Sequence, residues 1–291
     1  MSAKRFAARF LPPIVRDMGR YISNRLSREF DYLPGGWDSG NSRIRGWNVE
    51  SVVSAQKARW PLFLRAVRGP GPLTVAHPIW NVREATARSE QDYTWHNIIM
   101  AYAYVLALAA RQRDRVSLLD WGGGVGQHYV LGKVLVPQVE IDYHCKELPL
   151  LCQYGRELFP EASFYEDEEG CFKNTYDLVM ASDSLQYSRD WRTVVSRLAS
   201  VSRSYLYVAH LPILHHEASF VVVQRPYRHG YLTEYQSWHL NRAEFLNHMS
   251  AVNMELVREF LFGERLHVAR APEQGELRGF LFRPSGRGMS G

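Results

Sequence analysis

Four glycines and one acid in the stretch LLDWGGGVG, residues 118–126, have the types and spacing of a ligand-binding turn. Asp120 precedes the alternating glycines Gly122, Gly124 and Gly126. Glycine adopts backbone angles that other residues resist, and it lets a ligand approach the main chain closely. Backbone N–H groups at a helix start bind anionic groups, while a nearby carboxylate favours positive ones. The stretch therefore predicts a tight turn, a closely approaching ligand, or both.

Two common glycine-rich sites fit this stretch less well. A dinucleotide-binding turn follows the pattern G-x-G-x-x-G/A, and its sixth position, counted from Gly122, is here Gln127. A small residue is needed there because the helix packs closely against the strand. A phosphate-binding loop ends in Gly-Lys-Ser/Thr, which this stretch lacks. We therefore disfavour a nicotinamide-dependent dehydrogenase and a phosphate loop.

An alternating pattern of strands and helices surrounds the turn. The apolar run at residues 116–119 predicts a strand, and a helix is expected to begin at Gln127. Further strands are expected at 139–144, 163–165, 176–181 and 204–209, with helices at 148–158 and 191–199. Such alternation predicts a parallel sheet with helices on both faces. Ligands bind such a sheet at the carboxyl ends of its strands, where the glycines fall.

A further helix is expected ahead of the first strand. Ser89 begins a capping box, and apolar residues from Trp95 to Ala109 recur at helical spacing. Its nearly apolar run, residues 98–110, is shorter than the roughly 20 residues that a membrane-spanning helix requires. We therefore predict a buried helix and no transmembrane segment.

The acid-glycine stretch resembles the first motif of class I S-adenosylmethionine-dependent methyltransferases, carried here by Asp120, Gly122, Gly124 and Gly126. The resemblance extends over residues 88–284. It implies an α/β fold with a Rossmann-like, doubly wound, seven-stranded sheet, and S-adenosyl-L-methionine as the cofactor. The last two strands, expected at 256–262 and 279–283, would form an antiparallel pair. The stretches HNIIMAYAYVLALA, LLDWGGG, DSLQY and QRPY are similar, more narrowly, to a bacterial family of methyltransferases of unsettled substrate.

The resemblance assigns further contacts with the cofactor. Glu147, in YHCKELP, matches the acid at the end of the second strand that accepts both ribose hydroxyls. In FYEDEE, Asp167 is our choice for the group that meets the adenine amine, although the other acids of that run compete for the role. An acidic run of this kind is also typical of a solvated loop. YDLVMASDSLQY resembles the fourth-strand segment, which brings Ser182 and Asp183 to the catalytic end.

Methyl transfer to a hydroxyl requires an aligned acceptor and a base that removes the proton. His210 is our first candidate for the base, because it directly follows the fifth predicted strand and histidine titrates near neutral pH. Asp183 is the second candidate, and His215 or His216 comes next; each histidine also has a purely structural interpretation. Three further polar residues are expected at the cofactor: His128, His96 and Asn97.

Residues 211–241 are expected to form an insertion over the substrate end of the sheet. Residues 220–224 suit a strand, and residues 228–230 suit a turn. The candidates for acceptor contacts are four aromatic residues: Tyr187, Tyr227, Tyr231 and Trp238. Aromatic side chains such as these suit a wall for a sugar or phenolic ring, and they equally suit the packing of a small hairpin. The sequence leaves both interpretations open.

The positive charge of the chain is concentrated at its N-terminus. Residues 1–30 hold seven Lys or Arg against two acids, so the remaining residues are balanced in charge. A neutral body argues against nucleic acid as a partner. After Pro12 and Pro13 the segment has the pattern of an amphipathic basic helix, which would either pack on the body or rest on an anionic membrane surface. We divide the chain into this segment (1–30), a loop-rich and helical region (31–87) and the methyltransferase domain (88–291).

The three cysteines indicate a reducing compartment. Cys145, Cys152 and Cys171 are odd in number and lack the spacing of zinc ligands, so we predict neither a disulfide framework nor a metal site. The N-terminus lacks the cleavage site of a secretory signal. We expect a cytoplasmic protein, in peripheral contact with the inner face of the membrane if residues 1–30 bind there.

Two functions remain after these steps. The first is an S-adenosylmethionine-dependent methyltransferase, an O-methyltransferase acting on a small molecule or a sugar or glycan precursor. The second is a non-catalytic protein that keeps the methyltransferase fold and serves as a partner or scaffold. The intact acid-glycine motif and Glu147 favour the first.

Overall fold

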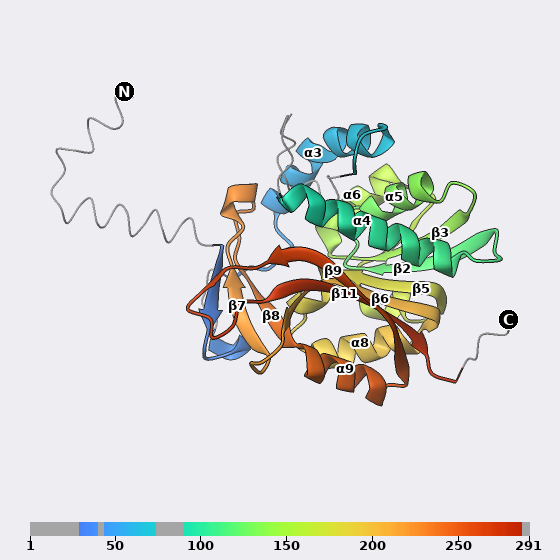
Figure 1. The fold of residues 1–291 in the computed structure, drawn as a ribbon. Helices are drawn as coiled ribbons and strands as arrows, with labels where there is room; N and C mark the ends of the chain where they lie inside the picture. Colours follow the sequence, from blue (N-terminus) through green and yellow to red (C-terminus); the bar gives the residue numbers. More distant parts are fainter. Residues whose placement is uncertain (1–28, 40–43, 74–89, 287–291) are drawn as a thin grey trace, which may run out of the picture.

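Strand β2 (Arg115–Trp121) leads directly into the glycine turn and has parallel neighbours on both sides. The structure is a computed structural model that describes residues 29–39, 44–73 and 90–286 (Figure 1). Seven strands form the main part of the sheet. In order across it they are β4 (Ser163–Tyr165), β3 (Glu140–Lys146), β2 (Arg115–Trp121), β5 (Tyr176–Ser182), β6 (Ser202–Leu214), β11 (Glu276–Pro284) and β9 (Met254–Arg265).

The directions of these strands confirm the predicted fold class. The five strands from β4 to β6 are parallel, whereas β11 pairs antiparallel with both β6 and β9. This is the Rossmann-like, doubly wound sheet with an antiparallel final pair that a class I methyltransferase requires. Strand β5 is buried along nearly its whole length, because helices cover both of its faces.

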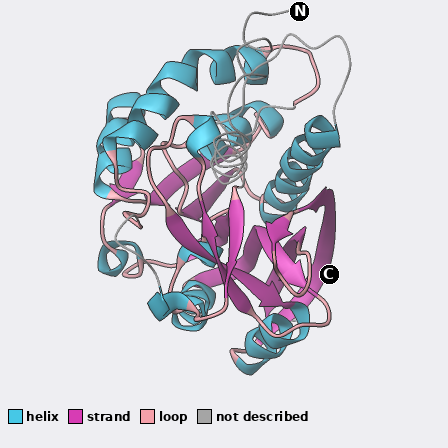
Figure 2. Cartoon of the chain, turned by 90° about the vertical axis from the view of Figure 1, so that its left-hand side faces the viewer, coloured by secondary structure: helices cyan, strands magenta, loops and turns pink. Residues whose placement is uncertain are grey.

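Helices cover the two faces of the sheet (Figures 1 and 2). Neighbouring residues of a strand point to opposite faces, so Leu118 belongs to one apolar cluster and Leu119 to the other. The helices of the first face are α4 (Glu90–Ala109), α5 (Gln127–Leu135) and α6 (Pro149–Leu158), with α3 (Glu50–Arg68) packed outside α5 and α6. Those of the second face are α8 (Trp191–Ser200) and α9 (Arg242–Ala251).

The structure adds four strands that the sequence did not predict as part of the sheet. They continue it in the order β8 (Tyr235–Asn241), β7 (Phe220–Gln224), β1 (Phe30–Leu33) and β10 (Val268–Ala269). Among the described residues the sheet therefore has eleven strands, seven of which form the predicted core. The join is made by β6, whose Ile213 and Leu214 pair in parallel with Leu240 and Asn241 of β8.

The predicted insertion needs a correction at its start. Residues 211–214 belong to β6, which runs to Leu214 and so enters the segment assigned to the insertion. The strand at 220–224 matches β7, and the expected turn lies at the short 3-10 helix η3 (Tyr227–His229), which Gly230 ends in a left-handed conformation. The loop-rich region 31–87 contributes β1, which pairs antiparallel with β7.

Some predictions lie outside the described residues. These are the amphipathic helix within residues 1–28 and Ser89, the first residue of the capping box. Within the described ranges, no helix has the length and apolar character needed to cross a membrane. The three remaining short elements are η1 (Trp37–Ser39), α7 (Glu168–Cys171) and η2 (Leu185–Tyr187).

Candidate active site

The register of the sheet brings the ends of three strands to one edge. Asp120 of β2 pairs with Met180 of β5, and Ser182 of β5 pairs with Ala209 of β6. The residues that follow these pairs are therefore close together, although they are far apart in the chain. They include the glycine turn, Asp183 and His210, which places all three groups at the edge where parallel sheets bind ligands.

The turn after β2 requires glycine for two separate reasons. Gly122, Gly124 and Gly126 all have positive φ, at +76°, +61° and +97°, a region that side chains with a Cβ rarely adopt. At Gly122 a Cβ would also lie 2.3 Å from the Cβ of Ser184. Ser184 is fixed in this position because its hydroxyl donates to the Trp121 carbonyl oxygen at 2.7 Å. The turn is thus packed directly against the segment after β5.

Asp120 is fully buried against the glycine turn, where its carboxylate would meet a Cβ placed at Gly123. Its Oδ2 accepts a 2.6 Å hydrogen bond from the Tyr143 hydroxyl and lies 2.9 Å from His128 Nδ1. Burial, with a contribution from the Asp120 charge, raises the pKa of Tyr143 well above its ordinary value, so this phenol stays a donor. These partners hold the carboxylate against the turn, and the contact of Asp120 with the cofactor stays a prediction.

A cavity of about 390 Å³ lies in front of the turn. Its lining includes three predicted cofactor residues, Gly122, Gly124 and Ser182, as well as His128. Trp47, Trp95 and Ile98 also line it, and the sequence did not point to these three as site residues. Trp95 and Ile98 lie on α4, so this helix reaches the cavity through them and not through His96 and Asn97, which do not line it. We call this space the cofactor cavity.

Glu147 lies in the wall of the cofactor cavity, where β3 has just ended. Its Oε2 accepts the Gly124 N–H at 2.9 Å, and its Oε1 accepts the Leu148 N–H at 2.7 Å. Burial raises the pKa of Glu147, while these two backbone donors act in the opposite direction. The carboxylate is therefore held in a fixed orientation, with lone pairs remaining for the hydroxyls of a ligand.

Asp167 does not line this cavity. Its carboxylate accepts the Gly170 N–H at 2.7 Å and caps the short helix α7, and the residue is exposed. The predicted contact with an adenine amine therefore has no support from its position. Leu148 and Leu151 provide apolar lining beside Glu147.

Asp183 and His210 form a close pair at the edge of the cofactor cavity. Asp183 Oδ1 lies 3.1 Å from His210 Nδ1, and both side chains line the cavity. Gln186 donates to the same Asp183 oxygen at 2.6 Å. The ring of Trp95 lies 5.2 Å from the imidazole, and His210 is only 8% exposed. A carboxylate that contacts an imidazole nitrogen orients the ring.

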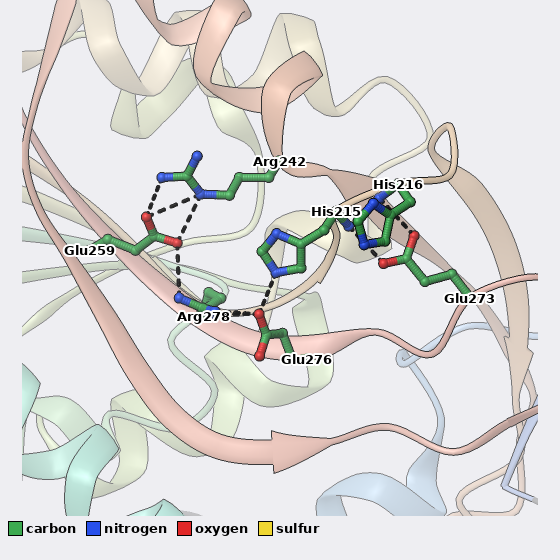
Figure 3. A network of polar contacts seen from close by, with 7 residues as sticks. All are labelled: His215, His216, Arg242, Glu259, Glu273, Glu276 and Arg278. Atoms are coloured by element: carbon green, nitrogen blue, oxygen red, sulfur yellow. Dashed lines mark hydrogen bonds and ion pairs between the residues drawn. The ribbon is translucent and has the colours of Figure 1, made fainter.

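The other candidate bases lie elsewhere. His215 and His216 follow the end of β6, are exposed and line neither cavity. Figure 3 shows His215 paired with Glu276, and the backbone N–H groups of both histidines donating to Glu273. Their neighbours in this surface network are Arg278, Glu259 and Arg242. The structure thus separates these two histidines from the glycine turn.

A second, smaller cavity of about 70 Å³ adjoins the first. The two cavities share five lining residues: Trp47, Trp95, Asp183, Tyr187 and His210. The additional strands β1, β7 and β8 contribute Phe30, Gln224 and Tyr235 to its walls. The Asp183–His210 pair therefore lies between the two spaces. We call the second space the acceptor cavity.

The four predicted acceptor residues divide into two groups. Tyr187 lines both cavities, and Tyr231 lines the acceptor cavity. Tyr227 and Trp238 line neither: the Tyr227 hydroxyl donates to Glu234, and the Trp238 indole N–H donates to the Arg189 carbonyl oxygen. Trp238 also stacks on Trp37 at 5.8 Å, so its ring serves packing, as the hairpin interpretation proposed.

Within the described part of the chain, no group of three or more His, Cys, Asp or Glu side chains is arranged to hold a metal ion.

The chain matches no protein-family model and no curated protein. It is similar in fold to the magnesium protoporphyrin IX methyltransferase of Synechocystis, crystallised with bound S-adenosylmethionine (12% identity, 84% of this chain, 100% of that chain, TM-score 0.45). The 1,6-didemethyltoxoflavin-N1-methyltransferase of Burkholderia thailandensis, with bound S-adenosylhomocysteine, is also similar in fold (12% identity, 65% of this chain, 78% of that chain, TM-score 0.43). A third protein of similar fold is the mitomycin 7-O-methyltransferase (13% identity, 81% of this chain, 69% of that chain, TM-score 0.44). Likeness at this level assigns no cofactor, acceptor or residue role to the present chain.

Proposed function

We propose that the protein transfers a methyl group from S-adenosyl-L-methionine to a hydroxyl of a small molecule or of a sugar or glycan precursor. The observation that carries this proposal is the position of the Asp183–His210 pair between two cavities. One cavity has the glycine turn and Glu147 in its wall, and the other has aromatic walls. A cofactor and an acceptor bound in the two spaces would meet at a group able to remove a proton.

The residues of the cofactor cavity fit S-adenosylmethionine. The cavity, at about 390 Å³, has the size of a small-molecule site, for which volumes of about 300–1,000 Å³ are usual. Glu147 presents a fixed carboxylate to ribose hydroxyls, and Leu148 and Leu151 supply an apolar wall for a base. The glycines expose the main chain to the remainder of the ligand.

S-Adenosylmethionine, held by Glu147 and the glycine turn, would supply an electrophilic methyl group to the acceptor oxygen and would leave as S-adenosylhomocysteine. His210 then has one task, which is to accept the hydroxyl proton at Nε2, while Asp183 holds Nδ1 and stabilises the positive ring. Trp47 and Trp95 line both cavities and exclude water from the junction. Proton removal of this kind contributes about 10²–10⁴-fold to a rate.

The test is calorimetric titration with S-adenosylmethionine, S-adenosylhomocysteine and NADH. We expect micromolar binding of both sulfur compounds and none of NADH. Glu140→Gln is the matched control for a Glu147→Gln variant, because Glu140 is an exposed carboxylate at the opposite end of β3. Absence of binding by both sulfur compounds would overturn the proposal and favour the scaffold function.

A further inference from the structure

The acceptor cavity is small and has aromatic walls. Its volume is about 70 Å³, whereas a closed cavity of about 150 Å³ holds benzene, so a ring bound here would extend into the adjoining cofactor cavity. Trp47 stacks on Tyr235 at 4.2 Å and meets the edges of Tyr187 and Tyr231 at 5.2 and 5.6 Å. All four rings line the cavity, so a bound group would lie against π-faces and ring edges.

Gln186 lines this cavity, and its buried Oε1 has no hydrogen-bond partner among the described residues. The side chain lines the cavity and is only 2% exposed. Its Nε2 donates to Asp183 Oδ1 at 2.6 Å and to the His210 carbonyl oxygen at 3.4 Å. Both partners accept hydrogen bonds only, so the amide orientation is fixed and Oε1 must face elsewhere. A buried acceptor of this kind requires a donor from the ligand.

Glu29 adds a carboxylate to the wall. Gln224 donates to its Oε1 at 2.8 Å, and the Tyr187 hydroxyl donates to Gln224 at 3.1 Å. His229 Nε2 lies 3.5 Å from the other carboxylate oxygen. These contacts position Glu29 within a chain of hydrogen bonds that begins at Tyr187, beside the Asp183–His210 pair.

The charges around the acceptor cavity favour a cation. Its described lining holds the carboxylates of Glu29 and Asp183, two histidines, and no Lys or Arg. Two arginines contact residues of this region: Arg225 pairs with Asp31, and Arg59 donates to the His229 carbonyl oxygen. Carboxylates and aromatic faces are the two groups that recognise ammonium ions in a partly desolvated site.

We propose that the acceptor cavity binds a small ring compound carrying a protonated amino group, which donates to Gln186 Oε1 and to the Glu29 carboxylate. The ring lies against Trp47, Tyr231 and Tyr235, and its hydroxyl points to the Asp183–His210 pair. This inference rests on the proposed methyl transfer and adds the class of acceptor to it. A phenolic amine and an amino sugar share this chemistry.

The test compares ligands that differ in the amino group, with S-adenosylhomocysteine present. Tyramine against 4-ethylphenol represents phenols, and glucosamine against glucose represents sugars. We expect the amine of one pair to bind about tenfold or more tightly than its neutral counterpart, as measured by calorimetry. Glu29→Gln should bring this ratio close to one without changing the affinity for S-adenosylhomocysteine. Glu140→Gln, which alters an exposed carboxylate that lines neither cavity, should leave the ratio unchanged.

Three outcomes would overturn the inference: equal affinity for both members of each pair, no binding of either amine, or a preference that survives Glu29→Gln. If Glu29→Gln does not fold, the wild-type ratio still decides, and Gln186→Leu should weaken the amine severalfold. Binding of S-adenosylhomocysteine together with methylation of neutral acceptors would retain the proposed function and reject the amine. Failure of S-adenosylhomocysteine to bind would reject the proposed function itself.

Discussion

Asp183 and His210 follow neighbouring parallel strands, and both hold the left-handed backbone conformation, with φ of +53° and +55°. Few residues other than glycine adopt this region, and each case costs of order 1–3 kcal/mol. The Asp183 N–H donates to the Ala209 carbonyl oxygen at 3.0 Å, which ties the two turns together. Strained backbone of this kind clusters at functional sites, where the surrounding structure holds it in place.

This geometry allows variants that remove the base with little added strain. Asparagine tolerates left-handed backbone, so His210→Asn and Asp183→Asn should both fold. We expect His210→Asn to lower kcat about 10²–10⁴-fold, with affinity for S-adenosylhomocysteine within about threefold of wild type. Methyl transfer under single-turnover conditions measures the first effect and calorimetry the second. His216→Gln, on an exposed histidine, is the control, and full activity of His210→Asn would exclude His210 as the base.

Glu147→Gln should weaken binding of the cofactor. The carboxylate accepts two backbone N–H groups, and an amide would turn a donor toward one of them. Hydrogen bonds to charged groups contribute about 1.5–3 kcal/mol, so the Kd for S-adenosylhomocysteine should rise at least about tenfold. Calorimetry of Glu147→Gln beside Glu140→Gln measures this difference. Equal affinities would show that Glu147 does not contact the cofactor.

Gly122→Ala should destabilise the protein more than Gly36→Ala. Both glycines have positive φ, which costs alanine roughly 1–2 kcal/mol, but no atom lies within 4 Å of a Cβ at Gly36. At Gly122 the added Cβ meets Ser184, and overpacking costs about 1–3 kcal/mol more. The difference between the two variants in their free energy of unfolding, measured with urea, isolates the cost of the contact with Ser184. Similar losses of stability in the two variants would mean that Ser184 moves away from the added Cβ at no measurable cost.

His239 should make the protein less stable in acid. It lies in β8, is fully buried and stacks on Phe220 at 5.3 Å. Neither of its ring nitrogens has a hydrogen-bond partner among the described residues. Burial lowers the pKa of His239 from 6.5 to about 3. Below pH 6.5 the unfolded chain therefore binds a proton that the folded protein does not. The contribution to stability is complete above pH 6.5 and declines as the pH falls toward 3.

The expected loss from His239 is about 1.4 kcal/mol per pH unit within that window. Urea unfolding of wild type and of His239→Gln at pH 7.5 and pH 5.0 measures it, because glutamine does not titrate. The stability difference between the two proteins should shift by about 2 kcal/mol in favour of the variant at the lower pH. His216→Gln serves as the exposed control. A constant difference would show that the folded protein protonates His239 normally.

The order of strands and helices was accessible from the sequence because each parallel strand is a short apolar run between helical repeats. The strand predicted at 176–181, for example, matches Tyr176–Ser182. Strand β1 was not accessible, because four residues of mixed polarity become a strand only through pairing with distant residues 221–224. The left-handed backbone at Asp183 and His210 has no local signal either, since it follows from the packing of two turns.

The site was predicted in part. The glycine turn carries its own conformational requirement, and the residues that follow the strands must meet at one edge. The hydrogen-bond partners of the Asp120 carboxylate were not predictable, because they depend on how Tyr143 and His128 pack against it. Trp47 and Trp95 were missed as site residues because their place at both cavities depends on how distant segments pack.

Strand β6 supplies His210 to the region where the two cavities meet. Four residues later, its Leu214 pairs with Asn241 of β8. One continuous strand thus spans the place of reaction and the scaffold of the acceptor cavity. Side chains alternate along a strand, so inserting a single residue between His210 and Leu214 would turn every later side chain of β6 to the opposite face. In the proposed function, the backbone of β6 would fix the spacing between methyl donor and acceptor. New acceptor specificity is then expected to arise from changes in cavity side chains, with the length of that strand preserved.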